Sequence, residues 1–379
     1  MAPIRVGLIG LSGAPLDEYE GVSWAPNAHL PYLKASPNHE IVALLNSSAE
    51  SGRQAVIRYN LPPNTKTYEK PEDLAADPDV DLVVCSVRVD RHMLTVKPSI
   101  IAGKAVYVEW PLEKNLEIAK EVADLGRKHN VKSIVGIQGA FAPIAQKLKA
   151  AIGSGRIGKV LSSTITASSG SSSDTEVKGV RYFTDRKIGG NPVSIHLGHA
   201  FEWIAAALGE FKCSDSLLSN RHPTKNIIDP AKDNQIVYKD VPNNVPDQIM
   251  MQGIVSPLNV PVSIHYRVGQ PFPGTPQLDW RVQGDLGELR ITMSTFFLML
   301  GSPDEKLEYY NKQTGEIEIL EPEKDEWDEL PIPARNIARL YEAFRKDEWH
   351  PDFDWAVKRH EMLDEIWRKY DKDSGDSLL

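Results

Sequence analysis

The sequence predicts a two-domain protein, in which an α/β domain with a doubly wound parallel sheet precedes an α+β domain with a large, mostly antiparallel open sheet. Three observations support this fold class. Short apolar runs alternate with segments of helical period across residues 4–137, which is typical of βαβ units. The first run ends at Gly10, where a dinucleotide-binding fold has its pyrophosphate turn. After residue 137 the alternation stops and strand-like runs follow one another.

The length of 379 residues suits two domains of ordinary size. We assign residues 1–137 to the dinucleotide-binding domain. Residues 138–371 form the α+β domain, which would carry the substrate and oligomer surfaces and ends in two helices. Residues 372–379 are expected to form a disordered tail.

In the first domain we expect strands at residues 4–9, 40–45, 81–85, 105–108 and 133–137. Helices are expected at residues 24–33, 49–59, 72–76, 91–102 and 116–129. Residues 14–22 are polar and acidic, so we interpret them as a loop inserted after the glycine turn.

In the second domain we expect helices at residues 143–152 and 195–208 and a flexible loop at residues 170–174. Strands are expected at residues 159–167, 248–255, 260–266, 279–283, 287–292 and 307–310. Amphipathic helices at residues 337–346 and 355–370 end the domain.

The composition excludes several classes of protein. A net charge of −9 argues against general affinity for nucleic acid or anionic membranes. Two cysteines cannot form a disulfide framework and suit a reducing compartment. The chain shows neither a signal-peptide pattern nor an apolar run long enough to span a membrane. We therefore expect a cytoplasmic location.

The turn after the first strand is an imperfect nucleotide motif. In the pattern G-x-G-x-x-G that begins at Gly10, Ser12 and Pro15 replace the second and third glycines. The backbone of Gly10, Leu11 and Ser12 still offers N–H groups to a pyrophosphate. Alone, this signal is weak because many strands end in glycine.

The end of the second strand bears on the choice of cofactor. NAD-specific folds place a carboxylate here for the ribose 2′-hydroxyl, but this chain has Asn46 and Ser47, with Arg53 further on. These residues tolerate a 2′-phosphate, which gives NADP a slight preference over NAD. In the simpler alternative, Asn46 or Ser47 caps the following helix.

Landmarks along nearly the whole chain resemble the glucose–fructose oxidoreductase/inositol dehydrogenase (Gfo/Idh/MocA) family. They are VGLIG near the start, His29 in AHLPYL, DLVVCSV followed by His92, GKAVYVEWP, GSGRIGKV and GHAFEW. Glu109-Trp110, QG at residues 138–139, VPD before QGIV, and VPVS resemble the subgroup that contains the yeast galactose-pathway repressor.

The resemblance implies a cleft between a Rossmann domain and an open-sheet domain, a bound nicotinamide cofactor, and dimers or tetramers that pair those sheets. Together with the turns above, it gives these candidate cofactor-binding residues: Gly10, Leu11, Ser12, Trp24, Asn46, Ser47, Arg53, Ser86, Val87, Arg88, His92, Glu109, Trp110 and Gln138. For Arg88, a solvated loop position is equally compatible with the sequence.

Two positions depart from the family's catalytic pattern. Family dehydrogenases have a lysine where this chain has Trp110, and an aspartate where it has Ile195. A lysine polarises the substrate oxygen and assists proton transfer, whereas an indole is limited to stacking on the nicotinamide site or forming its wall.

His199 matches the family histidine that accepts the hydroxyl proton, so we take it as the first catalytic candidate. His196 lies one helical turn earlier and is a candidate replacement for the lost carboxylate, although a structural histidine is the safer interpretation. Tyr182 borders the expected substrate pocket and is either a proton donor or, more simply, a packing aromatic. A zinc site lacks further ligands at useful spacing, so we expect no metal.

Two functions remain open. The first is an NAD(P)-dependent oxidoreductase that acts on a sugar, polyol or related carbonyl compound with a non-standard catalytic site. The second is a catalytically inactive, cofactor-binding regulator like the galactose-pathway repressor, which would bind a partner protein and work in the nucleus. We favour the oxidoreductase because the residues support a cofactor site better than a partner surface.

Overall fold

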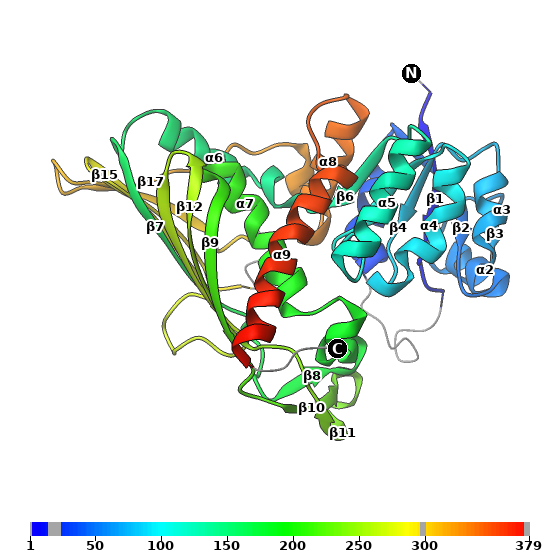
Figure 1. The fold of residues 1–379 in the computed structure, drawn as a ribbon. Helices are drawn as coiled ribbons and strands as arrows, with labels where there is room; N and C mark the ends of the chain where they lie inside the picture. The colour runs from blue at the N-terminus through cyan, green and yellow to red at the C-terminus, as the bar shows by residue number, and fades with distance from the viewer. Residues whose placement is uncertain (1, 14–23, 296–300, 375–379) are drawn as a thin grey trace.

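The computed structural model describes residues 2–13, 24–295 and 301–374 and has two lobes joined by helices (Figure 1). The predicted insertion at residues 14–22 and residues 375–379 of the predicted tail lie outside the described residues.

The N-terminal lobe is a Rossmann domain, as predicted. Its six parallel strands run in the order β3-β2-β1-β4-β5-β6. They are β1 (Ile4–Ile9), β2 (His39–Leu45), β3 (Lys66–Tyr68), β4 (Leu82–Cys85), β5 (Ala105–Glu109) and β6 (Ser133–Gly136). The sequence did not predict β3, because three partly exposed residues carry no apolar pattern.

Helices cover both faces of this sheet, and most begin where predicted. They are η1 (Ala25–His29), α1 (Leu30–Ala35), α2 (Ala49–Arg58), α3 (Pro71–Ala76), η2 (Val89–Arg91), α4 (His92–Ile101) and α5 (Leu116–Lys128). The predicted helix at residues 24–33 is split, because η1 is a π-helical turn. The N-cap of α2 is Ser48, whose side chain accepts from Ser51 N–H, so Asn46 and Ser47 were the wrong candidates for the cap.

The C-terminal lobe holds an eight-stranded sheet in the order β17-β16-β15-β14-β7-β13-β12-β9. All neighbouring pairs are antiparallel except β7 and β13, which confirms a mostly antiparallel sheet. The strands are β7 (Val160–Ser168), β9 (Gly209–Ser219), β12 (Gln248–Pro257), β13 (Val260–Arg267), β14 (Leu278–Gly284), β15 (Gly287–Met293), β16 (Lys306–Asn311) and β17 (Ile317–Ile319).

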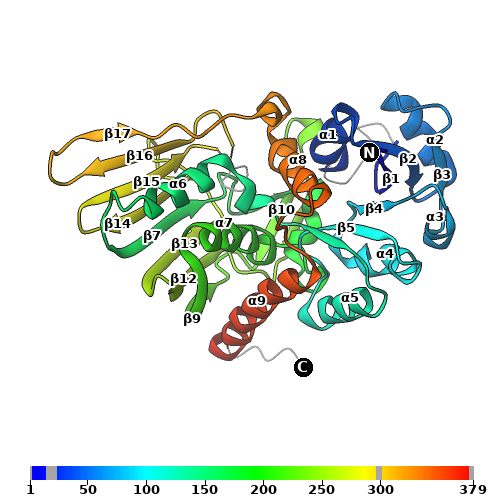
Figure 2. The same cartoon turned by 90° about the horizontal axis from the view of Figure 1, so that it is seen from above.

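One face of this sheet carries helices and the other is exposed. Figure 2 shows α6 (Pro143–Gly153) and α7 (Gly198–Leu208) lying over the strands. Burial alternates along β13 and β14, as expected of strands with one covered face. A short helical turn precedes each of these helices. It is η3 (Gln138–Phe141) before α6 and the π-helical η6 (Pro192–Leu197) before α7. The predicted helix at residues 195–208 therefore begins earlier, at a cap formed by Asn191.

A second, smaller sheet was not predicted. It has the order β11-β10-β8 and comprises β8 (Thr175–Val177), β10 (Thr224–Asp229) and β11 (Gln235–Pro242). The short helical turns η4 (Lys178–Thr184), η5 (Arg186–Ile188) and η7 (Pro230–Lys232) accompany it. In Figure 1 it lies at the lower edge, the side toward which the carboxyl ends of the Rossmann strands point.

The last two helices bind the lobes together. After η8 (Glu326–Glu329), α8 (Ile332–Arg345) returns to the Rossmann domain, where Tyr341 stacks between Tyr32 and Tyr107. The final helix, α9 (Phe353–Ser374), packs against α5 and β9. Residues 372–374, which we assigned to the tail, are therefore helical.

Within the described residues, no helix combines the length and apolar character that a membrane span requires.

Candidate functional site

The turns at the carboxyl ends of β1, β2, β4, β5 and β6 lie along one edge of the Rossmann sheet. Most predicted cofactor residues lie in these turns: Gly10, Leu11, Ser12, Asn46, Ser47, Ser86, Val87, Glu109 and Gln138. This is the edge at which doubly wound sheets bind nucleotides.

Residue 10 must be glycine because the β1 turn lies in close contact with the β4 turn. Its φ is +98°, and a Cβ there would lie 2.4 Å from the Ser86 carbonyl oxygen. A Cβ on Gly13 would lie 2.4 Å from the Ser51 carbonyl oxygen in α2. The two glycines thus let the β1 turn approach β4 and α2 closely, although the nucleotide motif itself is broken.

The β2 turn is held by Asn46, whose Nδ2 donates to the Leu11 carbonyl at 2.6 Å. Ser47 is exposed. Arg53, the proposed contact for a 2′-phosphate, is 2.7 Å from a Glu50 carboxylate oxygen in the first turn of α2. Because this cation already has an acidic partner, the preference for NADP stays a prediction.

The buried polar atoms at this edge without a hydrogen-bond partner among the described residues include Trp24 Nε1, Asn46 Oδ1 and Gln138 Oε1. One is a donor and two are acceptors. Unpaired buried polar atoms are costly in a folded protein, and a dinucleotide has ribose hydroxyls, phosphates and a carboxamide that match both kinds. The residues present therefore fit a nicotinamide dinucleotide.

Arg88 connects the two lobes. Its guanidinium makes two hydrogen bonds to Asp90, at 2.6 and 2.7 Å, and lies 5.8 Å from the centre of the Tyr182 ring. Tyr182 is in η4, so the predicted substrate-side tyrosine does lie beside the β4 turn. Whether either residue contacts a ligand stays a prediction.

His92, a predicted cofactor residue, already has two backbone neighbours, so its contact with a cofactor stays a prediction. Its Nδ1 lies 3.1 Å from the Leu112 carbonyl oxygen and its Nε2 lies 3.0 Å from that of Val87. Each ring nitrogen faces a backbone carbonyl oxygen, and the buried imidazole therefore lies between the β4 turn and the β5 turn.

Glu109 ends β5 and is buried at the same edge. Its Oε1 lies 2.9 Å from His29 Nε2, and His29 Nδ1 is 2.9 Å from the Tyr341 hydroxyl. The carboxylate covers Gly136, where a Cβ would be only 2.5 Å away. In the sequence His29 was only a family landmark, and its pairing with Glu109 could not be predicted because the two residues are far apart in the chain.

His199, the second residue of α7, is partly exposed and has no hydrogen bond to any described residue. Burial lowers the pKa of its imidazole to about 4, although the charge of Glu109 acts in the opposite direction. The imidazole is therefore neutral at pH 7 and can accept a proton.

His196 is more deeply buried and is already engaged. Its Nδ1 is hydrogen-bonded to the Tyr266 hydroxyl. Burial lowers its pKa to about 3, with further contributions from His199 and Lys225. His196 is only three residues before His199, but its side chain contacts Tyr266 on β13.

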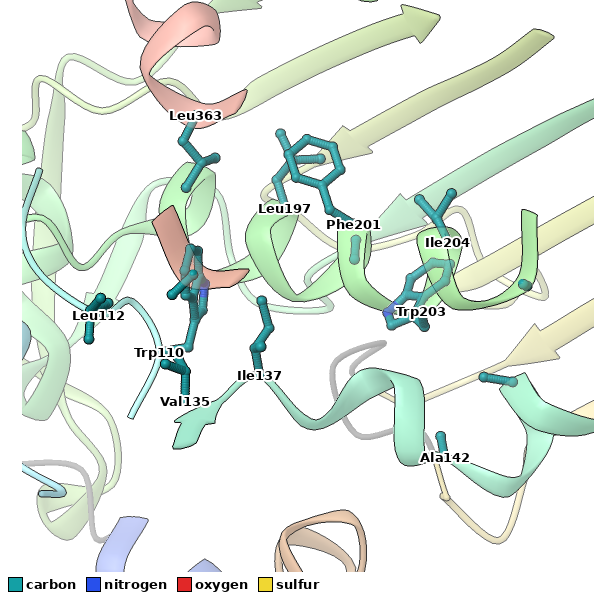
Figure 3. Close-up of a cluster of buried hydrophobic side chains, with 14 of the residues drawn as sticks. Trp110, Leu112, Val135, Ile137, Ala142, Leu197, Phe201, Trp203, Ile204 and Leu363 are labelled. Carbon is teal, nitrogen blue, oxygen red and sulfur yellow. The ribbon is translucent and has the colours of Figure 1, made fainter. Parts of the chain in front are cut away.

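Trp110 lies in the core that joins the lobes, with Ile137, Leu197 and Leu363 around it (Figure 3). Its Nε1 donates to the Ser194 carbonyl at 2.9 Å, and the indole is 5% exposed. The side chain that we expected at the nicotinamide site instead fills this core, where its hydrogen-bonding capacity is already used.

Metal-binding side chains do not gather in the described residues: no group of three or more His, Cys, Asp or Glu could hold an ion.

The fold and this edge define an NAD-binding protein of the oxidoreductase type. Residues 4–137 match the model "Oxidoreductase family, NAD-binding Rossmann fold" (GFO_IDH_MocA), and residues 143–293 match the Gal80p C-terminal domain. A dehydrogenase of Aspergillus oryzae, aclE, is 31% identical over 375 residues, which cover 96% of this chain and 95% of that protein. The chain belongs to the Gfo/Idh/MocA oxidoreductase family, with a Gal80p-like C-terminal domain.

Solved structures share the fold along the whole chain. A super-repressor mutant of Gal80p from Saccharomyces cerevisiae superposes with a TM-score of 0.84 at 24% identity, covering 97% of both chains. Levoglucosan dehydrogenase in complex with NADH and levoglucosan superposes with a TM-score of 0.76 at 16% identity, covering 98% of this chain and 97% of that one.

Proposed function

We propose that this protein is an NAD(P)-dependent oxidoreductase that acts on a sugar, a polyol or a related carbonyl compound, and that His199 is its proton acceptor. The observation that carries the proposal is the position of His199 beside the β6 turn, where a Cβ on Gly139 would lie 3.4 Å from the His199 carbonyl oxygen. Its imidazole has no hydrogen bond to a described residue, and burial lowers its pKa to about 4. A bound nicotinamide dinucleotide supplies the hydride-transfer chemistry.

Residues of this chain would bind the cofactor and accept the proton. The N–H groups of Gly10 and Ser86 donate to Leu45 and Ile9 within the sheet, so the residues that follow them in these turns would offer N–H groups to the dinucleotide. Gln138 Oε1 is a buried acceptor without a partner among the described residues. In oxidation of an alcohol, His199 takes the hydroxyl proton, and the Glu109 carboxylate stabilises the resulting imidazolium. This assignment needs neither a lysine at Trp110 nor an aspartate at Ile195.

Two similar proteins support parts of this proposal, one the reaction type and the other the cofactor and substrate class. The Aspergillus oryzae relative is named a dehydrogenase, and levoglucosan dehydrogenase binds NADH together with a sugar derivative. We extend nucleotide binding and a sugar-like substrate to this chain as a proposal.

Thermal unfolding with NAD⁺, NADH, NADP⁺ and NADPH tests the cofactor, because a ligand that binds only the folded state raises Tm. The absence of a shift with all four would contradict the proposal. Nicotinamide absorbance, followed over a panel of sugars, polyols and ketoses, tests turnover.

A second candidate is a regulator that binds the cofactor without turnover. It is favoured by the burial of Trp110 at the position of the family lysine and by the match to the Gal80p C-terminal domain. In that case the protein would bind a partner protein and occur in the nucleus. Cofactor binding without turnover across the panel, together with a nuclear signal from a fluorescent fusion, would favour this candidate; a cytoplasmic signal would favour the enzyme.

For the assembly, we propose a homodimer or tetramer formed through the exposed face of the eight-stranded sheet. Large side chains on that face, including Leu217, Met250 and Tyr310, are 39–54% exposed. Light scattering of the wild type and of Met250→Glu tests this, because a buried glutamate would dissociate the oligomer.

A further inference from the structure

Two pairs of ionisable residues lie within electrostatic range of each other between the small sheet and the start of α7, and we call the four the Lys225 cluster. They are Glu176 on β8, Lys225 on β10, His196 on η6 and Tyr266 on β13. Lys225 Nζ lies 3.6 Å from Glu176 Oε2, and the two side chains are 5% and 14% exposed. Proton transfer at His199 does not require this cluster.

The ammonium of Lys225 is poorly satisfied for a buried cation. It has three N–H donors, and Glu176 is its only acidic partner within 4 Å among the described residues. Their separation is longer than a charge-assisted hydrogen bond, which is typically about 2.7–2.9 Å. Buried ion pairs are stable only when further hydrogen bonds satisfy their remaining groups, so this arrangement favours an additional ligand.

The other half of the cluster is uncharged. The Tyr266 hydroxyl and His196 Nδ1 are hydrogen-bonded. Burial raises the pKa of Tyr266 well above 10 and lowers that of His196 to about 3. Burial also raises the pKa of Glu176, while Lys225 opposes that shift. At neutral pH the cluster therefore combines donors and acceptors in a mostly apolar setting.

The cluster also lies on the substrate side of the molecule. His196 is three residues before His199, and the charge of His199 contributes to the lowered pKa of His196. The small sheet lies at the lower edge in Figure 1, on the side toward which the carboxyl ends of the Rossmann strands point. Lys225 in turn acts electrostatically on His196, which connects the cluster to the segment that carries His199.

We propose that Lys225 and Glu176 are the recognition end of the substrate site and bind neighbouring hydroxyl groups of a neutral polyol or sugar. This inference rests on the proposed function and specifies its substrate class. Lys225 donates to one hydroxyl oxygen and Glu176 accepts from the next, while the reacting hydroxyl lies at His199. A sugar acid is disfavoured, because its carboxylate would meet that of Glu176.

Calorimetric titration of the NADH-saturated protein with myo-inositol, D-glucose and D-glucuronate tests the proposal. We compare the wild type with Lys225→Met, Glu176→Gln and the double variant, which leaves no unpaired buried charge and so protects against misfolding. Lys239→Met is the matched control, since Lys239 is an exposed lysine on β11 of the same small sheet.

We expect each single variant to weaken binding of myo-inositol or D-glucose by roughly 10- to 100-fold, as for a lost hydrogen bond to a charged group. NADH affinity and the Lys239→Met control should stay unchanged. Glu176→Gln should shift selectivity toward D-glucuronate.

Wild-type affinities in both single variants would overturn the proposal, as would an equal loss in Lys239→Met or no binding of any neutral probe. Failure of the oxidoreductase proposal can be distinguished from failure of the inference about Lys225 and Glu176. Polyol binding that needs Lys225 but never leads to cofactor reduction contradicts only the oxidoreductase, whereas polyol turnover unaffected by Lys225→Met contradicts only this inference.

Discussion

Trp110 and Gly198 fit against each other at the junction of the two lobes. A Cβ on Gly198 would lie 2.5 Å from Trp110 Nε1 and 2.7 Å from its Cζ2, so only glycine leaves room for the indole. The same Nε1 donates to the Ser194 carbonyl, one helical turn earlier. The tryptophan that replaces the family lysine is therefore matched by a glycine at the first residue of α7, and the two positions should behave as a pair.

This fit predicts that Gly198→Ala destabilises the protein by about 1–3 kcal/mol, as for an overpacked core. Urea unfolding measures the effect. Gly153→Ala is the control, because a Cβ at Gly153 meets no atom within 4 Å. In a Trp110→Leu background the cost of Gly198→Ala should shrink; an unchanged cost would show that the contact with the indole is not its cause.

If His199 is the proton acceptor, His199→Gln should lower kcat/KM by about 10²- to 10⁴-fold, the usual contribution of a general base. Cofactor affinity should not change. His265→Gln serves as the control, because His265 is exposed on the far face of β13. The pKa of about 4 also predicts that His199 stays competent well below pH 6, so its acid limb in kcat/KM should lie near pH 4. An acid limb near pH 6.5 would contradict this assignment.

Glu50 should govern the choice between NAD and NADP, since its carboxylate holds Arg53 at 2.7 Å. Glu50→Gln removes that partner and leaves the guanidinium free for a 2′-phosphate. We expect the ratio of NADPH to NADH affinity to rise by roughly 10-fold, consistent with one charge-assisted contact. Fluorescence titration with both nucleotides measures the ratio, and Arg53→Met in the same background should abolish the gain. A ratio that Glu50→Gln leaves unchanged would place Arg53 outside the cofactor site.

The sequence alone predicted the strands and turn residues whose signal lies in neighbouring positions of the chain. Buried parallel strands such as β4 and β5 are continuous apolar runs, and their order follows from the βαβ rhythm. The turn residues Asn46 and Gln138 could be predicted for the same reason, because each directly follows such a strand. The strands β8 and β10 escaped detection because they are short and partly polar, and β10 is flanked by turn residues.

Contacts between distant residues were beyond sequence analysis. The absence of lysine at Trp110 was evident, but the destination of the indole depends on Gly198, which lies in the other lobe. In the same way, His29 and Glu109 meet only after η1 and β5 have assembled. Lys225 had no distinguishing pattern, because its burial results from the pairing of β8 with β10.

Buried neutral histidines should make the fold sensitive to acid, and His360 is the clearest case. Burial lowers the pKa of His360 to about 3 from an ordinary value of 6.5, and His92 adds to the effect. Between these values the unfolded chain binds a proton at this site and the folded chain does not, so the free energy of unfolding falls as the pH drops below 6.5. From pH 6.5 to pH 5 this one residue accounts for about 2 kcal/mol.

Urea unfolding at pH 7.5 and pH 5.0 tests this for the wild type, His360→Gln and the exposed control His265→Gln. The wild type and the control should lose stability together on acidification. His360→Gln should lose about 2 kcal/mol less, while retaining part of the slope, because burial also lowers the pKa of His39 and of His196, to about 4 and about 3. A pH dependence identical to that of the wild type would mean that His360 is protonated in the folded protein, and its contact with the Trp110 ring, 4.9 Å between centroids, would then be a cation–π pair.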